Sequence, residues 1–319
     1  MVVVLGSALA LALAANIGSN NAGVTMAPAF GAGARSRWAS LILFAAFAVA
    51  GAALLGGRVV RTLGEDLFTA PLSGHPMLFL VVAPGVTLGL VALANVLRVP
   101  VPTTPLAVCS LLGIGLAFGV VRSSKALEVV GWWLVSPVAA LALTWAAGLF
   151  LAWKFPRLLD APGPRAKRWT GGLLTIEGCY SAFAIGSNNV ANSMAPLVGG
   201  EVVGIQAAVW LGGAAMAAGA LAWGGGVLDT LGKGITELCP ARALVVGVVA
   251  ATGLLLGSLF GVPLSGACLV TGGVMGFSLA TSGASRTAAN LHVRRIAVLW
   301  TTGPAAAVGM AYAAVTLLR

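Results

Sequence analysis

Two copies of one polar stretch decide how this chain is organised. They are IGSNNAGVTMAP at Ile17–Pro28 and IGSNNVANSMAP at Ile185–Pro196, identical at eight of twelve positions and offset by 168 residues. Three further pairs recur in the same order: Gly51–Gly64 with Gly219–Gly232, Val99–Ala117 with Val262–Ala280, and Trp133–Pro137 with Trp300–Pro304. Four matches at nearly constant spacing indicate an internal duplication.

The composition around these motifs is that of a membrane protein. The chain has 319 residues, of which 59% are hydrophobic and only 8% charged, whereas soluble domains carry about 25% charged residues. Repeated apolar runs approach or exceed the roughly 20 residues that cross a hydrocarbon core. Examples are Leu41–Leu55, Leu78–Val96, Val129–Trp153, Val203–Trp223, Ala243–Leu259 and Ile296–Leu318. We expect an all-α, multi-pass protein of the bacterial inner (plasma) membrane, with the lipid bilayer as its surroundings.

The net charge of +10 does not indicate nucleic acid. The basic residues lie in short loops between apolar runs, as membrane topology produces. The densest group, between Lys154 and Arg168, falls in a proline-containing linker. We therefore expect a first transmembrane repeat at 1–153, a basic cytoplasmic linker at 154–170 and a second repeat at 171–319. If each half crosses the membrane an odd number of times, the second half inserts upside down, as in many secondary transporters.

The repeated motifs supply the candidate polar site. Amides and hydroxyls in an apolar region must find partners, because hydrocarbon offers none. Two copies favour a polar site at the repeat interface over simple packing between helices. Glycine before each motif and proline at its end predict a broken helix in each half, and a half-helix N-terminus binds anions readily. The candidates here are Ser19, Asn20, Asn21, Thr25, Ser187, Asn188, Asn189, Asn192 and Ser193.

Two proline-opened segments extend this candidate site. Prolines at 100, 102 and 105 exclude a regular helix there, and Pro263 opens the matching segment of the second half. Non-helical backbone at membrane depth is tolerated only inside protein or beside a cavity. We therefore expect a re-entrant hairpin in each half, rather than two extramembrane loops. These hairpins add Thr103, Thr104, Ser265 and Gly266 to the candidate anion-binding residues.

The paired GSNN and MAP residues resemble the duplicated motifs of the inorganic phosphate transporter family, which read G-A-N-D-x-A-N. The match is best at Gly186–Asn192, GSNNVAN, and VPVPTT at 99–104 resembles the family's P-x-S-T-T hairpin. The resemblance covers nearly the whole chain. It implies two inverted-topology repeats, an anion site between them and a homodimer.

One departure from the phosphate-carrying members bears on the substrate. Asn21 and Asn189 stand where those members have an aspartate linked to sodium binding. The NNVAN run is more similar to the family's bacterial sulfate permease branch, which implies proton coupling. Sulfate only accepts hydrogen bonds, whereas monohydrogen phosphate also donates one and benefits from a carboxylate acceptor. We expect sulfate transport by proton symport, with sodium-coupled phosphate transport as the alternative. Another oxyanion, such as molybdate, thiosulfate or selenate, is a less favoured substrate than either.

Glu177 is the acidic residue placed to couple a proton. It lies in LLTIEGCYSAF, ahead of Asn188, and an intramembrane carboxylate is a functional candidate by default. The alternative is an interfacial residue at a helix start, flanked by Gly171, Gly172 and Gly178.

Other classes of protein fit the sequence less well. An enzyme needs a nucleophile with a base or clustered acids and histidines, but the two histidines are remote from each other and the remaining acids lie at helix ends or in loops. A channel would show a continuous polar lining. We therefore expect no catalytic residues, no metal site and no cofactor.

Overall fold

The structure is a computed structural model, and it describes residues 1–70, 78–96, 102–159, 164–235, 239–283 and 291–318. Helices make up the fold, and no strand occurs among these residues. The first half holds α1 (Val2–Gly31), α2 (Arg37–Leu55), α3 (Gly57–Arg61), η1 (Thr62–Asp66), η2 (Leu78–Val82), α4 (Ala83–Val96), α5 (Thr103–Phe118) and α6 (Ser123–Lys154). The second holds α7 (Pro164–Asn189), α8 (Ala191–Gly199), α9 (Ile205–Ile235), α10 (Pro240–Phe260), α11 (Gly266–Ser282) and α13 (Leu291–Leu318), after η3 (Pro156–Leu159).

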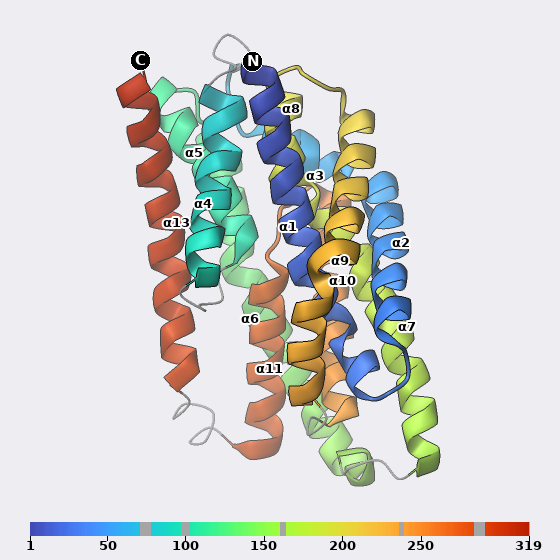
Figure 1. The fold of residues 1–319 in the computed structure, drawn as a ribbon. Coiled ribbons are helices and arrows are strands. Elements are labelled where there is room, and N and C mark those ends of the chain that lie inside the picture. The colour runs from blue at the N-terminus through green and yellow to red at the C-terminus, as the bar shows by residue number, and fades with distance from the viewer. Residues whose placement is uncertain (71–77, 97–101, 160–163, 236–238, 284–290, 319) are drawn as a thin grey trace.

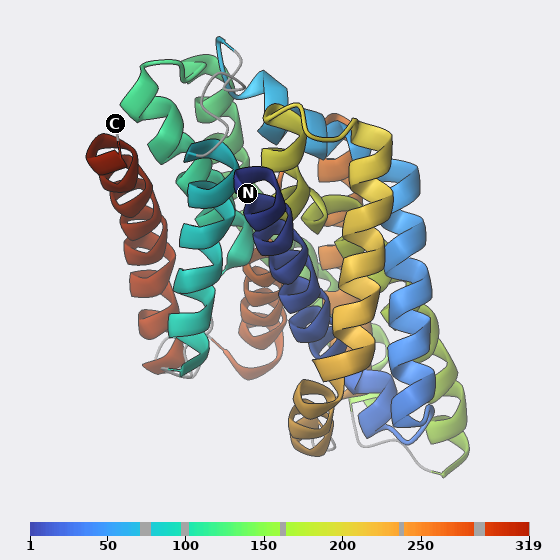
Figure 2. The ribbon, with the colours of Figure 1, turned by 45° about the horizontal axis from the view of Figure 1, so that its top comes forward.

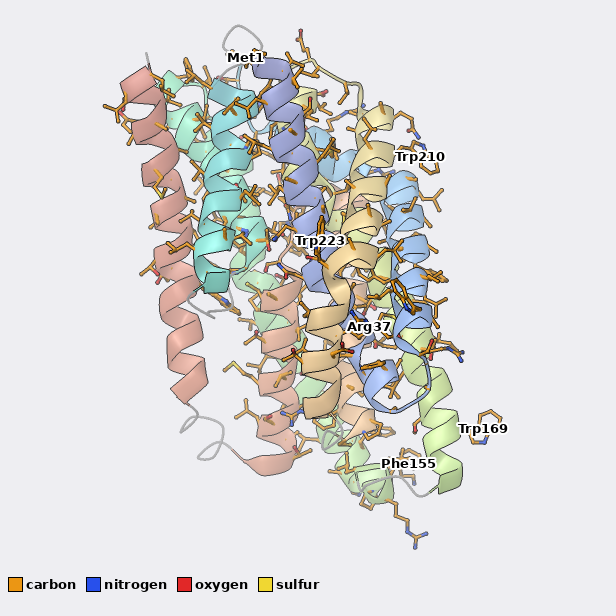
Figure 3. All side chains as sticks on the ribbon, viewed as in Figure 1. Met1, Arg37, Phe155, Trp169, Trp210 and Trp223 are labelled. Carbon is orange, nitrogen blue, oxygen red and sulfur yellow. The ribbon has the colours of Figure 1, made fainter. Side chains whose placement is uncertain are left out.

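The helices form one elongated bundle (Figure 1). In the described parts of the chain, six helices are long and apolar enough to cross a membrane: Val2–Gly31, Arg37–Leu55, Ser123–Lys154, Ile205–Leu231, Pro240–Phe260 and Trp300–Leu318. The all-α, multi-pass prediction is therefore confirmed. Large apolar side chains lie exposed on the outside, including Trp169, Trp210 and Trp223 (Figure 3). Bilayer lipid, not water, suits such a surface.

Helices of one half pack against those of the other, and the contacts are reciprocal. Where α1 meets α9, a Cβ on Gly18 would lie 1.9 Å from the carbonyl oxygen of Met216; where α7 meets α2, a Cβ on Gly186 would lie 2.0 Å from that of Ala48. Both residues of the second pair are offset from the first by 168 positions. The pairs Gly51 with Phe183 and Gly219 with Ala15 repeat this relationship. Only glycine permits such close backbone approach.

A second set of helices shows the same reciprocal packing between the two halves. Helix α5 packs on α13 at Gly113 and Val308, and α11 packs on α6 at Gly276 and Leu141. Helix α13 lies at one edge of the bundle and α2 at the opposite edge in both views (Figures 1 and 2). The equivalent helices α1 and α7 run in opposite directions through the bundle (Figure 1).

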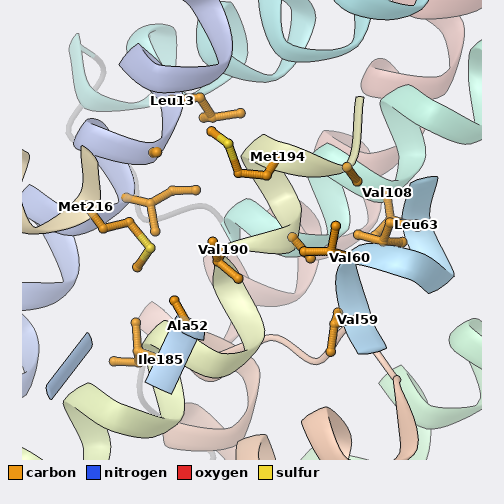
Figure 4. Close-up of a cluster of buried hydrophobic side chains, with 14 of the residues drawn as sticks. Leu13, Ala52, Val59, Val60, Leu63, Val108, Ile185, Val190, Met194 and Met216 are labelled. Atoms are coloured by element: carbon orange, nitrogen blue, oxygen red, sulfur yellow. The ribbon is translucent and has the colours of Figure 1, made fainter. Parts of the chain in front are cut away.

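The buried core lies where the motif helices meet. Ile185 of α7, Val190 between α7 and α8, and Met194 of α8 lie near Leu13 of α1 and Met216 of α9 (Figure 4). On the other side of α8, Val59, Val60 and Leu63 close the core. Burying this many apolar side chains fixes α8 at the centre of the molecule.

The prediction of a broken helix in each half is wrong for the first half. Helix α1 runs without interruption from Val2 to Gly31. Pro28 lies in its last turn and does not end the helix before Gly31. Gly18 serves the close approach to α9 instead of a break. In the second half the helix is interrupted at Val190, between α7 and α8.

The predicted linker at 154–170 is partly helical. Helix α6 ends at Lys154, η3 follows, and α7 already begins at Pro164, with residues 160–163 outside the described part. Proline at a first helical position suits this start. The division into 1–153, 154–170 and 171–319 remains a prediction, as does the cytoplasmic placement of the linker.

Candidate functional site

The second copy of the motif lies at the centre of the bundle with all its polar side chains buried. Ser187, Asn188 and Asn189 end α7, and Asn192 and Ser193 begin α8. None of the five is more than 5% exposed. Asn188 and Asn192 are four positions apart, so they share one face of this helix pair about 6 Å apart along its axis.

Asn188 holds the connection between α10 and α11. Its Nδ2 donates to the carbonyl oxygen of Val262 at 3.0 Å and to Ser258 Oγ at 3.2 Å. Its Oδ1 accepts a hydrogen bond from the Leu264 N–H at 2.9 Å. Both ends of the amide are therefore used within the protein, and they fix the chain immediately before α11.

Asn192 reaches the other half of the chain. Its Nδ2 donates to Thr104 Oγ1, at the start of α5, at 2.9 Å. Thr104 is 2% exposed, so this bond forms in a buried environment where its loss is costly. One face of the α7–α8 pair thus binds the beginning of α5 and the connection that leads into α11.

The two helix starts present similar hydrogen-bond donors. Thr104 Oγ1 accepts from Asn192, and Ser265 Oγ caps α11 by accepting from the Cys268 N–H at 3.3 Å. With the oxygen acting as acceptor, each hydroxyl proton is left to donate. The first backbone N–H groups of α5 and α11, including those of Thr103 and Gly266, have no partner inside their helices. Donors of these two kinds suit an oxyanion.

Two buried amide oxygens in the motif have no donor. Asn189 Oδ1 and Asn192 Oδ1 are inaccessible to solvent, and no hydrogen-bond donor lies within reach among the described residues. The Thr25 hydroxyl of α1 is in the same condition. An unsatisfied buried polar atom is unfavourable unless a bound species meets it. An amide oxygen accepts, so it suits a cation or a proton-bearing ligand.

The first copy of the motif is arranged differently. Ser19 Oγ donates to the Asn16 carbonyl oxygen, Asn20 Nδ2 to Asn16 Oδ1 and Asn21 Nδ2 to the Ile17 carbonyl oxygen, all within α1. Asn20 and Asn21 are half-buried. The connection that corresponds to the Asn188-bound segment includes residues 97–101, which lie outside the described part of the chain. The structure therefore links Asn192 to Thr104, and Asn188 to the segment that ends beside Ser265. It leaves Asn20 and Asn21 bonded within their own helix.

Glu177 lies away from these helix starts, eleven residues before Asn188, or about 16 Å along α7. Its side chain is 6% exposed and accepts a hydrogen bond from Ser181 Oγ at 2.6 Å. It faces Gly247 of α10, where an added Cβ would lie 2.1 Å from Glu177 Oε1. Among the described residues no cation pairs with it. It is a buried carboxylate within the bundle, as its sequence context predicts, and not an exposed interfacial one.

Two contributors to the site were not predicted. Ser258 is fully buried and bonds both Ser187 Oγ at 2.9 Å and Asn188. Trp133 of α6 donates from Nε1 to the Pro263 carbonyl oxygen at 2.8 Å. A single serine in an apolar helix gives little sequence signal. The recurring Trp–Pro pair did mark Trp133, but as evidence of duplication only.

Comparisons with known proteins identify the family and the fold of the chain. Residues 17–311 match the model of the phosphate transporter family. The chain is 29% identical over 309 residues to the sulfate permease CysP of Bacillus subtilis, covering 96% of this chain and 85% of the relative. It is 26% identical to a putative phosphate permease of Pyrococcus furiosus, with 87% and 86% covered. A sodium-dependent phosphate transporter structure superposes with a TM-score of 0.83 at 20% identity, over 99% of this chain and 98% of that one.

These relatives are permeases and transporters, not enzymes, and the fold is shared over the full length of the chain. Together with the six candidate spans, the match over residues 17–311 makes this a multi-pass membrane transporter that belongs to the phosphate transporter family.

Proposed function

We propose that the chain carries sulfate across the membrane by proton symport. The observation that carries the proposal concerns Asn188 and Asn192, which lie one turn apart. Asn188 bonds the connection that leads into α11, and Asn192 bonds the start of α5 in the other half. An anion between the two starts would meet the Thr104 and Ser265 hydroxyls and unpaired backbone N–H groups. This set consists of donors, which suits sulfate, and the similarity to a sulfate permease supports the same substrate.

The architecture that we infer is a pair of inverted-topology repeats. The reciprocal glycine contacts and the opposite directions of α1 and α7 support it. In this arrangement α5 and α11 each form one arm of a re-entrant hairpin, because both helices are shorter than a membrane crossing requires. Asn188 acts as a positioning residue for the second hairpin, since its amide is already used within the protein. A homodimer, as the family resemblance implies, remains part of the proposal.

A second candidate is sodium-coupled phosphate transport. The unpaired Asn189 and Asn192 oxygens favour it, because they could coordinate Na⁺ or accept a hydrogen bond from monohydrogen phosphate. For sulfate they have no use unless water or a cation meets them. The two substrates therefore make different demands on the same motif.

Uptake into proteoliposomes separates the candidates. Labelled sulfate and labelled phosphate are offered in turn, with a proton gradient or a sodium gradient imposed. Sulfate uptake that follows the proton gradient and ignores phosphate supports the main proposal. Phosphate uptake that needs sodium and ignores sulfate contradicts it and assigns the amide oxygens to a cation.

The substitution Thr104→Val tests the contact that joins the halves. It keeps the shape of the side chain and removes the hydroxyl, so one donor to the anion is lost. A hydrogen bond to a charged group contributes about 1.5–3 kcal/mol, which corresponds to a roughly 10- to 150-fold lower uptake at subsaturating substrate. Thr144→Val is the matched control, because the buried Thr144 hydroxyl bonds only to its own helix. Equal uptake by both variants would exclude Thr104 from the site.

A further inference from the structure

A groove on the outside of the bundle lies directly behind the segment that Asn188 holds. It has a volume of about 280 Å³ and runs between α6 and α10. Its walls come from residues 132–143 of α6 and 248–260 of α10, and Val262, Leu264 and Leu269 also line it. Val262 and Leu264 are the residues whose backbone groups bond Asn188. The segment before α11 therefore has the polar motif on one side and this groove on the other.

The lining is suited to hydrocarbon. Apart from Ser136, Thr252 and the indole of Trp132, its side chains are aliphatic, aromatic or glycine, and none is charged. The Thr252 hydroxyl is already engaged, since it donates to the Val248 carbonyl oxygen at 2.7 Å and lies 3.0 Å from Tyr180 OH. Val135, Leu143, Val248 and Leu256 on its walls are each well exposed. In a membrane protein such a surface faces lipid.

The length of the groove matches one lipid acyl chain. From 132 to 143 the α6 wall is about 16 Å long, which is close to half of a hydrocarbon core about 30 Å thick. One lipid acyl chain spans that half.

We propose that this groove binds one acyl chain of a bilayer lipid, which packs against Val262 and Leu264 and supports the α10–α11 connection from outside. Asn188 fixes the backbone of this connection from the inside, and Trp133 anchors Pro263 from α6. The acyl chain completes the packing on the side that faces the membrane. This role does not depend on which oxyanion is carried.

The test uses the purified chain in nanodiscs that contain a phosphatidylcholine with a photoactivatable diazirine in its acyl chain. After illumination, labelled peptides are mapped by mass spectrometry. Wild-type protein should be labelled more strongly on residues 132–143 and 248–264 than on the exposed Trp145, Leu149 and Phe150 of α6. Ala139→Phe, which fills the groove with an apolar ring, should remove this excess labelling. Ala146→Phe, on the same helix but outside the groove, should keep it.

Three results would overturn the proposal. The first is equal labelling of the groove and of the exposed control residues. The second is unchanged labelling of the groove in Ala139→Phe. The third is protection of the wild-type groove from labelling that disappears when a dimer is dissociated. The last result would assign the groove to a side chain of a second copy. If Ala139→Phe does not fold, judged by its thermal transition, Val135→Phe at the groove wall replaces it with the same expected loss.

Discussion

At the scale of single residues, the two copies of the motif have diverged in what they bond. Asn188 holds Val262 and Leu264, whereas its counterpart Asn20 bonds only Asn16 one turn earlier. Asparagine at equivalent positions therefore makes long-range hydrogen bonds in one half and a local hydrogen bond in the other. The Asn–Asn pairs are identical in sequence, so only the contacts reveal the difference.

This divergence predicts unequal effects of equivalent substitutions. Asn188→Ala leaves the Val262 carbonyl and the Leu264 N–H without their partner in a buried place, and should lower stability by about 2 kcal/mol or more. Asn20→Ala removes one bond of a half-buried side chain and should cost less than about 1 kcal/mol. Thermal unfolding in detergent measures both. Equal losses would mean that Asn188 does not hold the α10–α11 connection.

Glu201 provides a second comparison between equivalent positions. It has a φ of 57°, the left-handed conformation that disfavours residues with a Cβ, and its counterpart Gly33 has a φ of 71°. Glu201→Gly should therefore raise stability by about 1 kcal/mol. Gly33→Ala, with open space around its Cβ, should lower stability by a similar amount. A Glu201→Gly protein that melts earlier than wild type would contradict this account.

At the scale of elements, glycine sets how closely the two halves approach. Gly186→Ala would place a methyl group 2.0 Å from the Ala48 carbonyl oxygen at the α7–α2 crossing. The helices would have to separate, at a cost of about 1–3 kcal/mol or more. Gly172 of the same helix has no atom within 4 Å of an added Cβ, so Gly172→Ala should be neutral or slightly stabilising. Melting temperatures in detergent compare the two variants, and a similar loss in both would exclude the crossing as the cause.

At the scale of the whole molecule, the proton symport that we propose requires a group that carries a proton across. Glu177 is the candidate, as a buried carboxylate whose described partner is Ser181. Glu177→Gln keeps its shape and removes the charge, so uptake should no longer follow an imposed proton gradient, while exchange of labelled for unlabelled substrate persists. Glu128→Gln is the control, because Glu128 is an exposed residue paired with Lys125. Gradient-driven uptake by Glu177→Gln at the wild-type rate would show that Glu177 takes no part in coupling.

Much of this molecule follows from the sequence alone, for identifiable physical reasons. Long apolar runs with few charges can be stable only as membrane helices, so the all-α, multi-pass fold was predictable. The motif at 185–196 was recognisable because buried amides in hydrocarbon need partners. The duplication was visible because its spacing is nearly constant. Proline and glycine were weaker guides, since they predicted a break in α1 where the structure has a continuous helix.

The tertiary structure decided which polar groups meet. Asn192 and Thr104 are 88 positions apart and Asn188 and Leu264 are 76 apart, so no local pattern could pair them. These pairs form because glycine-mediated crossings bring α7 and α8 against elements of both halves. The sequence determines how many hydrogen bonds a side chain can donate and accept, but the packing of distant helices determines its partner. For that reason the sequence predicted a polar site at Asn188, while only the structure showed that its amide holds the chain before α11.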